Sequence, residues 1–157
     1  MVRRAVMSTT DSSLPAMPVA YPRSDSPESN TRVREPHDAI TVLVVDDHPR
    51  VRAALERALR STPGLRLVGS ACNGEEAVLM SGRLHPHVVV MDLAMPGISG
   101  VEATRRLMAG PEPPAVVALS GSRELMREAI AAGARGTLLK EADLTELLTT
   151  IRLAAGR

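Results

Sequence analysis

The chain has 157 residues, of which 44% are hydrophobic and 24% are charged, so it has room for one globular domain and an extension but not for a large multidomain enzyme. Its formal net charge of +1 creates no field that would favour nucleic acid or an anionic membrane as the main partner. A single cysteine excludes an intramolecular disulfide, the absence of Phe and Trp excludes a base-stacking platform, and no apolar run approaches the roughly 20 residues of a membrane span, so we expect a cytoplasmic protein.

The first 38 residues have the composition of a disordered tail. They contain five prolines and six serines, and their few apolar residues are scattered. Such a segment cannot bury enough apolar surface to offset the entropy lost on ordering. We therefore expect a Pro/Ser-rich disordered tail over residues 1–38 and one folded domain over residues 39–157.

The folded part alternates between short apolar runs and segments of helical period. Residues 40–45 form a β-branched run typical of a strand buried on both faces. The next segment places five apolar residues on one helical face and ends at Pro63-Gly64. These residues are Val51, Ala54, Leu55, Ala58 and Leu59.

The same strand and helix unit recurs four more times. Strands are predicted at 65–71, 88–91, 114–119 and 137–139, with helices at about 74–84, from about 99, up to about 132 and from about 143. Ser99 and Asp143 are each followed three residues later by Glu, which is the spacing of a capping box. In the last helix Leu144, Leu147, Leu148 and Ile151 are expected to face the core. Five such units with short links predict an α/β fold with a doubly wound, five-stranded parallel sheet and five helices.

Polar residues stand at the carboxyl ends of four predicted strands, where ligands bind in open parallel sheets. Asp46 and Asp47 follow the first strand, and Asp92, Ser120 and Lys140 follow the third, fourth and fifth. Lys140 is the one lysine beside 18 arginines, which indicates a site that needs a compact point charge. We expect these five side chains to converge.

Three carboxylates about 4 Å apart would repel one another by about 4 kcal/mol per pair at an effective dielectric constant near 20, so a cation is needed. Mg²⁺ suits an all-oxygen ligand set and leaves positions open for phosphoryl oxygens. Because Asp46 and Asp47 are needed for the metal, Asp92 is the predicted nucleophile that takes up a phosphoryl group. Lys140 and the Ser120 hydroxyl would bind the arriving oxygens.

Three stretches of the sequence resemble the receiver (CheY-like) domains of bacterial two-component response regulators. They are Val44–Pro49 (VVDDHP), Met91–Gly97 (MDLAMPG) and Gly136–Lys140 (GTLLK), and they are especially similar to receivers that precede a LuxR-type helix-turn-helix domain. The resemblance implies a flavodoxin-like fold and phosphorylation of Asp92 by a sensor histidine kinase. It also implies Mg²⁺ bound by Asp47, Asp92 and the carbonyl of Ala94, with Asp46 acting through water. Such a domain is a phosphoacceptor that signals by binding, not a turnover enzyme.

Four features depart from the family pattern. Thr137 replaces the usual aromatic residue whose rotation reports phosphorylation, Ala94 has no polar group to position a hydrolytic water, and Gly121 replaces the usual Ala. The sequence also ends at Arg157, which leaves no room for a DNA-binding domain. We therefore expect a stand-alone receiver that does not bind DNA directly, with an unknown protein partner and a possible homodimer.

Two other functions remain open at this point. Thr137 favours a receiver-fold interaction module that works without phosphorylation. A Mg²⁺-dependent phosphohydrolase would also use an Asp nucleophile, but it would need a second Asp where Ala94 stands.

Several other polar residues have an ordinary structural interpretation. Ser120 could instead cap the helix that follows it, and Cys72 is expected to be a small buried hydrophobe. His48 and the pair His85 and His87 are expected to be surface and loop residues, and the helix arginines are expected to be solvated. These arginines are Arg105, Arg106, Arg123 and Arg127.

Overall fold

Every predicted strand and helix is present in the structure. The computed structural model describes residues 38–156. The strands are β1 (Ile40–Val45), β2 (Leu65–Ala71), β3 (Val88–Asp92), β4 (Ala115–Ser120) and β5 (Gly136–Leu139). The helices are α1 (Pro49–Arg60), α2 (Gly74–Leu84), α3 (Gly100–Met108), α4 (Arg123–Ala131) and α5 (Leu144–Ala154).

The five strands form one parallel sheet in the order β2-β1-β3-β4-β5. The chain therefore moves outward from β1 to β2, returns past β1 to β3, and then continues to β4 and β5. This reversal creates a topological switch point between β1 and β3, and ligands of open α/β sheets bind beyond the carboxyl ends of the strands at such a point. The α/β prediction is confirmed, and the topology brings the ends of β1 and β3 side by side.

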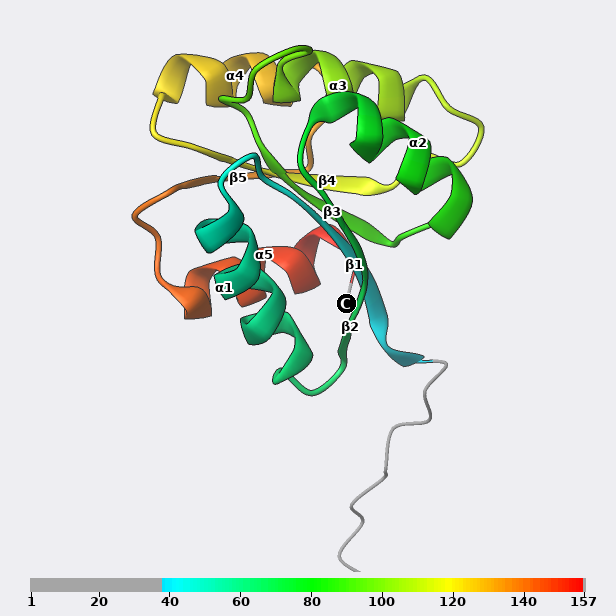
Figure 1. The fold of residues 1–157 in the computed structure, drawn as a ribbon, viewed down its shortest axis with the longest axis vertical. Coiled ribbons are helices and arrows are strands. Elements are labelled where there is room, and N and C mark those ends of the chain that lie inside the picture. The colour runs from blue at the N-terminus through cyan, green and yellow to red at the C-terminus, as the bar shows by residue number, and fades with distance from the viewer. Residues whose placement is uncertain (1–37, 157) are drawn as a thin grey trace, which may run out of the picture. The chain divides into compact units, whose positions relative to one another are not determined.

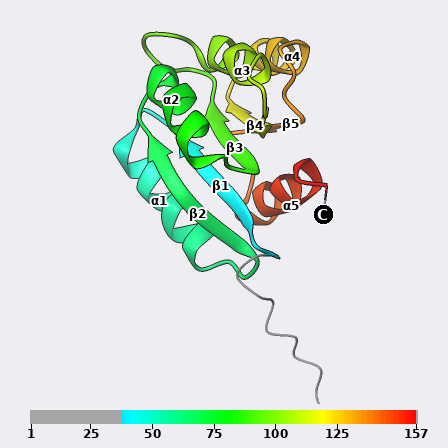
Figure 2. The ribbon, with the colours of Figure 1, turned by 90° about the vertical axis from the view of Figure 1, so that its right-hand side faces the viewer.

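The helices cover both faces of the sheet, with α1 and α5 on one face and α2, α3 and α4 on the other (Figures 1 and 2). Each face has its own apolar cluster. Val89, Met91 and Val101 contribute to the cluster under α2, α3 and α4, whereas Leu59 and Ile151 contribute to the cluster under α1 and α5. All residues of β1, β3 and β4 are buried, as their continuous apolar runs predict for strands covered on both faces.

Side chains cap the starts of four helices. Asp143 and Glu146 form the full predicted capping box at the start of α5. At the start of α3, Ser99 accepts from the amide of Glu102, but the carboxylate of Glu102 pairs with Arg105 and Arg106 rather than reaching back to Ser99. Ser99 and Asp143 are thus confirmed as helix caps, whereas Asn73 and Ser122, which cap α2 and α4, were not predicted.

Three residues predicted to face the core are exposed instead: Val51, Ala54 and Leu144. Val51 and Leu144 lie in the first turns of α1 and α5, which begin beyond the carboxyl ends of β1 and β5. Val51 lines a pocket with Leu55 and Leu119 that stays partly open to solvent. Ala54 is exposed because fewer residues of α1 are buried than the apolar pattern of the helix predicts.

The predicted disordered tail over residues 1–38 lies outside the described residues, except for Asp38. Within residues 38–156, no helix combines the length and the hydropathy that a bilayer crossing requires.

Candidate functional site

The carboxyl ends of β1, β3, β4 and β5 carry the polar residues that the sequence analysis singled out. Asp46 and Asp47 directly follow β1, Asp92 and Ser120 are the last residues of β3 and β4, and Lys140 directly follows β5. The parallel registers align these ends, because Val45 pairs with Met91, Asp92 with Leu119, and Ser120 with Leu139. Residues separated by up to 94 positions thus meet at one edge of the sheet.

Asp92 is completely buried and fully engaged. Its Oδ2 accepts a hydrogen bond of 2.8 Å from the ammonium of Lys140, and its Oδ1 accepts one of 3.0 Å from the amide of Ala94. A charge-assisted contact of this length is among the stronger polar interactions in proteins. Lys140 therefore pairs with the carboxylate of Asp92 and fixes its orientation.

Asp46 is also completely buried, but one of its oxygens has no hydrogen-bond partner. Its Oδ1 accepts from the amide of His48 at 2.8 Å, whereas its Oδ2 lies 4.0 Å from the ammonium of Lys140. Burial raises the pKa of Asp46 above its usual range, and the nearby carboxylate of Asp92 raises it further. A buried oxygen without a partner is costly, so this side chain is arranged for a group that supplies the missing contact.

The backbone at the end of β1 is held by α1. A guanidinium nitrogen of Arg52 donates a hydrogen bond of 2.7 Å to the carbonyl oxygen of Asp46. Arg52 comes from the first turns of α1 and is half-buried. This contact fixes the segment that carries both Asp46 and Asp47, a role that sequence reasoning missed because the target is a backbone atom.

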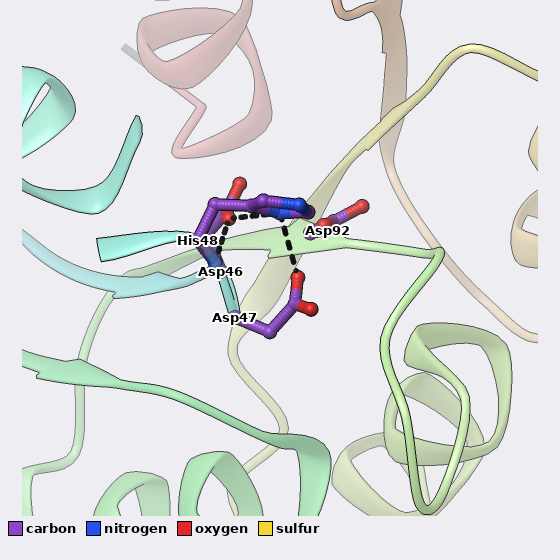
Figure 3. A group of neighbouring side chains, drawn as sticks. All are labelled: Asp46, Asp47, His48 and Asp92. Atoms are coloured by element: carbon purple, nitrogen blue, oxygen red, sulfur yellow. Dashed lines mark hydrogen bonds and ion pairs between the residues drawn. The ribbon is translucent and has the colours of Figure 1, made fainter. Parts of the chain in front are cut away.

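Asp47 and His48 complete a cluster of four side chains, shown in Figure 3. Atoms of Asp46, Asp47, His48 and Asp92 that could each bind a metal ion lie within 4.8 Å of one another. His48 was expected to be a surface residue, and its side chain is 62% exposed, yet its Nδ1 lies 2.9 Å from Oδ1 of Asp47. Its place directly after two aspartates at a strand end is a sequence signal that could have identified it as a member of the cluster.

Ser120 and Ala94 lie at the site but make local contacts. The Ser120 Oγ accepts a hydrogen bond from the amide of Ser122, and Ser122, not Ser120, caps α4. The interpretation of Ser120 as a helix cap is therefore wrong. Ala94 meets Asp92 through its amide, and the use of its carbonyl as a metal ligand stays a prediction.

The cluster has the composition of a site for a divalent cation. Three carboxylates face one ammonium, which leaves two negative charges to be neutralised. The buried Oδ2 of Asp46 and the Oδ1 of Asp47 have no hydrogen-bond partner. Hard oxygen ligands of this kind suit Mg²⁺, so these residues fit the predicted metal.

Other candidate residues have no part in this cluster. Cys72 is exposed rather than buried, and its hydrogen bond with Glu76 raises the pKa of the thiol, which disfavours the reactive thiolate. His85 lies 3.2 Å from the exposed carboxylate of Glu112, and His87 exchanges hydrogen bonds with Thr41. The exposed Arg105 and Arg106 pair with Glu102, as expected for a solvated helix face.

Comparison with known sequences supports the same assignment. Residues 42–152 match the response regulator receiver domain family. Response regulator GacA of Pseudomonas protegens is 46% identical over 116 residues, which are 73% of this chain and 54% of that protein. The transcriptional regulatory protein LiaR of Bacillus subtilis is 35% identical over 118 residues, 74% of this chain and 56% of that protein. The chain thus spans about half the length of the curated relatives it matches.

Solved structures show the same fold. The receiver domain of the response regulator NarL from Mycobacterium tuberculosis superposes with a TM-score of 0.72 at 30% identity, over 76% of this chain and 99% of that one. A LuxR-family response regulator from Aurantimonas superposes with a TM-score of 0.71 at 33% identity, over 76% of this chain and 87% of that one. With the strand order, the acidic cluster and the family match in agreement, this chain belongs to the response regulator receiver domains of two-component signalling.

Proposed function

We propose that this receiver accepts a phosphoryl group on Asp92 from the phosphohistidine of a sensor histidine kinase, in a Mg²⁺-dependent reaction, and signals by altered binding to a protein partner. A carboxylate oxygen of Asp92 attacks phosphorus while the bond from phosphorus to the donor nitrogen breaks. The electron pair of that bond returns to the imidazole of the kinase. The product is an acyl phosphate on Asp92.

The residues around Asp92 support this role. Lys140 contacts the carboxylate of Asp92 at 2.8 Å, so its ammonium lies beside the oxygen atoms of an arriving phosphoryl group. Ser120 ends the neighbouring strand β4, and its hydroxyl would bind a phosphoryl oxygen after giving up its contact with the Ser122 amide. That exchange would move the loop before α4 and carry the signal to the surface.

Asp46, Asp47, Asp92 and the carbonyl of Ala94 would hold Mg²⁺, with Asp46 acting through water. When bound, the ion neutralises the carboxylates and attracts the phosphoryl oxygens, which lowers the charge repulsion that opposes attack. The residues of this chain that keep the pocket assembled are Arg52, through the carbonyl of Asp46, and Lys140, through Asp92.

The observation that carries the proposal is the contrast between two buried aspartates in one pocket. Asp92 is paired with the ammonium of Lys140, whereas Asp46 keeps an oxygen without a hydrogen-bond partner for an incoming cation. These different contacts support Asp92 as the phosphoryl acceptor and Asp46 as a metal ligand.

The test is the intact mass of the protein after incubation with acetyl phosphate or phosphoramidate and Mg²⁺. One added phosphoryl group is expected in the wild type, none in Asp92→Asn, and none when EDTA removes the ion. Asp143→Asn is the matched control, because Asp143 caps α5 and lies outside the acidic cluster, so it should be modified like the wild type. Modification of Asp92→Asn, or of the wild type in EDTA, would contradict the proposal.

One observation favours the alternative of a receiver-fold interaction module that works without phosphorylation. Thr137 lies on β5 beside a groove of about 220 Å³ that is also lined by Arg123, Met126, Arg127 and Ile130. A threonine leaves this groove open, whereas the ring that the family usually has there is larger and would occupy part of it. If beryllofluoride with Mg²⁺ changes the NMR amide signals at Asp92 but not those of α4 and β5, this alternative is favoured.

The output partner is proposed to be a protein. LiaR of Bacillus subtilis is a transcriptional regulatory protein, but this chain matches only 56% of its length. We propose that the receiver domain itself makes no direct contact with DNA, because a formal net charge of +1 creates no field that would favour it, and that the domain acts through a partner protein or a second copy of itself.

A further inference from the structure

We propose that His48 is a fourth ligand in the acidic cluster and gives this site a preference for an imidazole-binding transition ion of the Zn²⁺ class over Mg²⁺. This inference rests on the proposed function only in taking Asp46, Asp47 and Asp92 as metal ligands. It adds a residue and an ion class that the phosphoacceptor chemistry does not require.

The distances around His48 match the edges of a coordination polyhedron. The Nδ1 atom of His48 lies 2.9 Å from Oδ1 of Asp47 and 3.4 Å from Oδ1 of Asp46. Two ligands that each bind an ion at about 2.1 Å are about 3.0 Å apart in octahedral geometry and about 3.4 Å apart in tetrahedral geometry. The imidazole nitrogen and the two carboxylates are therefore spaced as neighbouring ligands of one ion (Figure 3).

The carboxylates leave atoms available for that ion. The Oδ1 of Asp47 makes no hydrogen bond despite its short distance to the imidazole, so the two groups face each other without a well-aligned donor and acceptor. The Oδ2 of the wholly buried Asp46 is also without a hydrogen-bond partner. Both oxygens are therefore available to a cation.

The chemistry of the donor set selects the ion. Carboxylate and carbonyl oxygens suit Mg²⁺, whereas a neutral imidazole nitrogen binds Zn²⁺ and its neighbours in the transition series more tightly. Asp46, Asp47, Asp92 and His48 form a mixed nitrogen and oxygen set. The ring is also exposed, so it can turn toward an ion without opening the core.

A second histidine provides a matched control. The side chain of His85 is 64% exposed and lies 3.2 Å from a carboxylate of Glu112, much as His48 is 62% exposed and lies 2.9 Å from Asp47. His85 differs from His48 in its neighbours, because it belongs to no group of three or more potential metal ligands among residues 38–156. An effect of merely losing an exposed imidazole would therefore appear at both positions.

The experiment compares the wild type, His48→Asn and His85→Asn by calorimetric titration with Zn²⁺ and, separately, with Mg²⁺. Asn suits both backbones, since it is a favourable residue at the start of a helix and tolerates the left-handed conformation of His85, whose φ is 45°. We expect His48→Asn to weaken Zn²⁺ binding by about tenfold or more, with Mg²⁺ binding changed by less than about twofold. His85→Asn should bind both ions like the wild type.

A spectroscopic readout identifies the ligand. Co²⁺, which substitutes for Zn²⁺, should give the wild type and His85→Asn the same visible absorption bands, and these should shift in His48→Asn. Equal Zn²⁺ affinities for the two variants, or an unchanged Co²⁺ spectrum in His48→Asn, would overturn the inference.

Phosphorylation separates this inference from the proposed function. Uptake of a phosphoryl group from acetyl phosphate with Mg²⁺ is measured on the wild type and scored separately from Zn²⁺ binding. If the wild type takes up none while the Zn²⁺ difference persists, the proposed function fails and the His48 site stands.

Discussion

At the scale of single residues, the site contains two buried aspartates with different contacts. Asp92 accepts a hydrogen bond from the ammonium of Lys140, whereas Asp46 is buried with an oxygen that has no hydrogen-bond partner. The same chemical group therefore stabilises the fold at one position and costs stability at the other. Two predictions follow from individual contacts of the Asp46 segment.

The first concerns Asp46 and pH. Burial raises the pKa of Asp46 above its usual value of 3.8, so the folded protein binds this proton more tightly than the unfolded chain does. Ionisation of Asp46 therefore lowers the free energy of unfolding as the pH rises above the usual pKa of an aspartate. This free energy is regained as the pH falls and Asp46 takes up its proton. In the absence of divalent ions, Asp46→Asn should unfold at a higher urea concentration than the wild type at neutral pH, and the difference should shrink toward pH 4. Urea midpoints that stay equally far apart at every pH would contradict this.

The second concerns Arg52, whose guanidinium donates to the carbonyl of Asp46. Arg52→Met keeps much of the apolar stem but loses the donor, which should lower the free energy of unfolding by about 1–2 kcal/mol. Mg²⁺ binding should weaken several-fold, because the segment with two metal ligands is no longer fixed. Calorimetry and urea unfolding measure both effects. Arg50→Met, on the exposed side of the same helix, should change neither.

At the scale of elements, the carboxyl end of β3 and the start of α3 are packed backbone against backbone. Gly100 begins α3, and a Cβ atom at this position would collide with the carbonyl oxygen of Asp92. The helix can approach the strand end this closely only because residue 100 is glycine. The position of Asp92 thus depends on a residue that carries no side chain.

Gly100→Ala should therefore lower the free energy of unfolding by about 2 kcal/mol or more and slow phosphorylation of Asp92, because backbone atoms must shift. Gly121→Ala is the control, since a Cβ atom at that position meets nothing within 4 Å. It should leave stability unchanged or slightly raised, as the unfolded chain loses freedom. Urea unfolding and the intact-mass time course give the two readouts. Similar losses for both variants would argue against the packing explanation.

At the scale of the whole molecule, an ion bound at the sheet edge should stabilise the entire domain. Anything that binds only the folded state raises the free energy of unfolding by about 2.7 kcal/mol when its concentration is 100 times its dissociation constant. The unfolding temperature should therefore rise with Mg²⁺ concentration and fall when EDTA is added. Asp47→Asn should remove most of this dependence. An equal Mg²⁺ response in this variant would place the ion elsewhere.

The fold and the convergence of the acidic residues could be predicted from the sequence because both depend on periodicity. The carboxyl ends of the strands in a parallel sheet fall on one edge, so residues at the ends of β1, β3 and β5 lie near one another there. The burial of a side chain is harder to predict from periodicity, since it depends on which other residues pack against it. Val51, Cys72 and Leu144 are exposed, whereas Leu93 and Met95, which also lie beyond the end of a strand, are buried.

Hydrophobic periodicity also does not predict which side chains contact backbone atoms or how a ring is oriented. The bond from Arg52 to the carbonyl of Asp46 and the approach of His48 to Asp47 depend on the path of one short loop between β1 and α1. The choice of Ser122 over Ser120 as the cap of α4 depends on where the helix begins. Such details need coordinates.

The bond between Lys140 and Asp92 joins residues 48 positions apart, across β3, β4 and β5. During synthesis, an emerging chain has its acceptor aspartate long before the lysine that orients it. Under the proposed function, Asp92 is therefore oriented for phosphoryl uptake only once β5 has docked. We expect a chain in which β5 is not yet docked to be a poor phosphoryl acceptor.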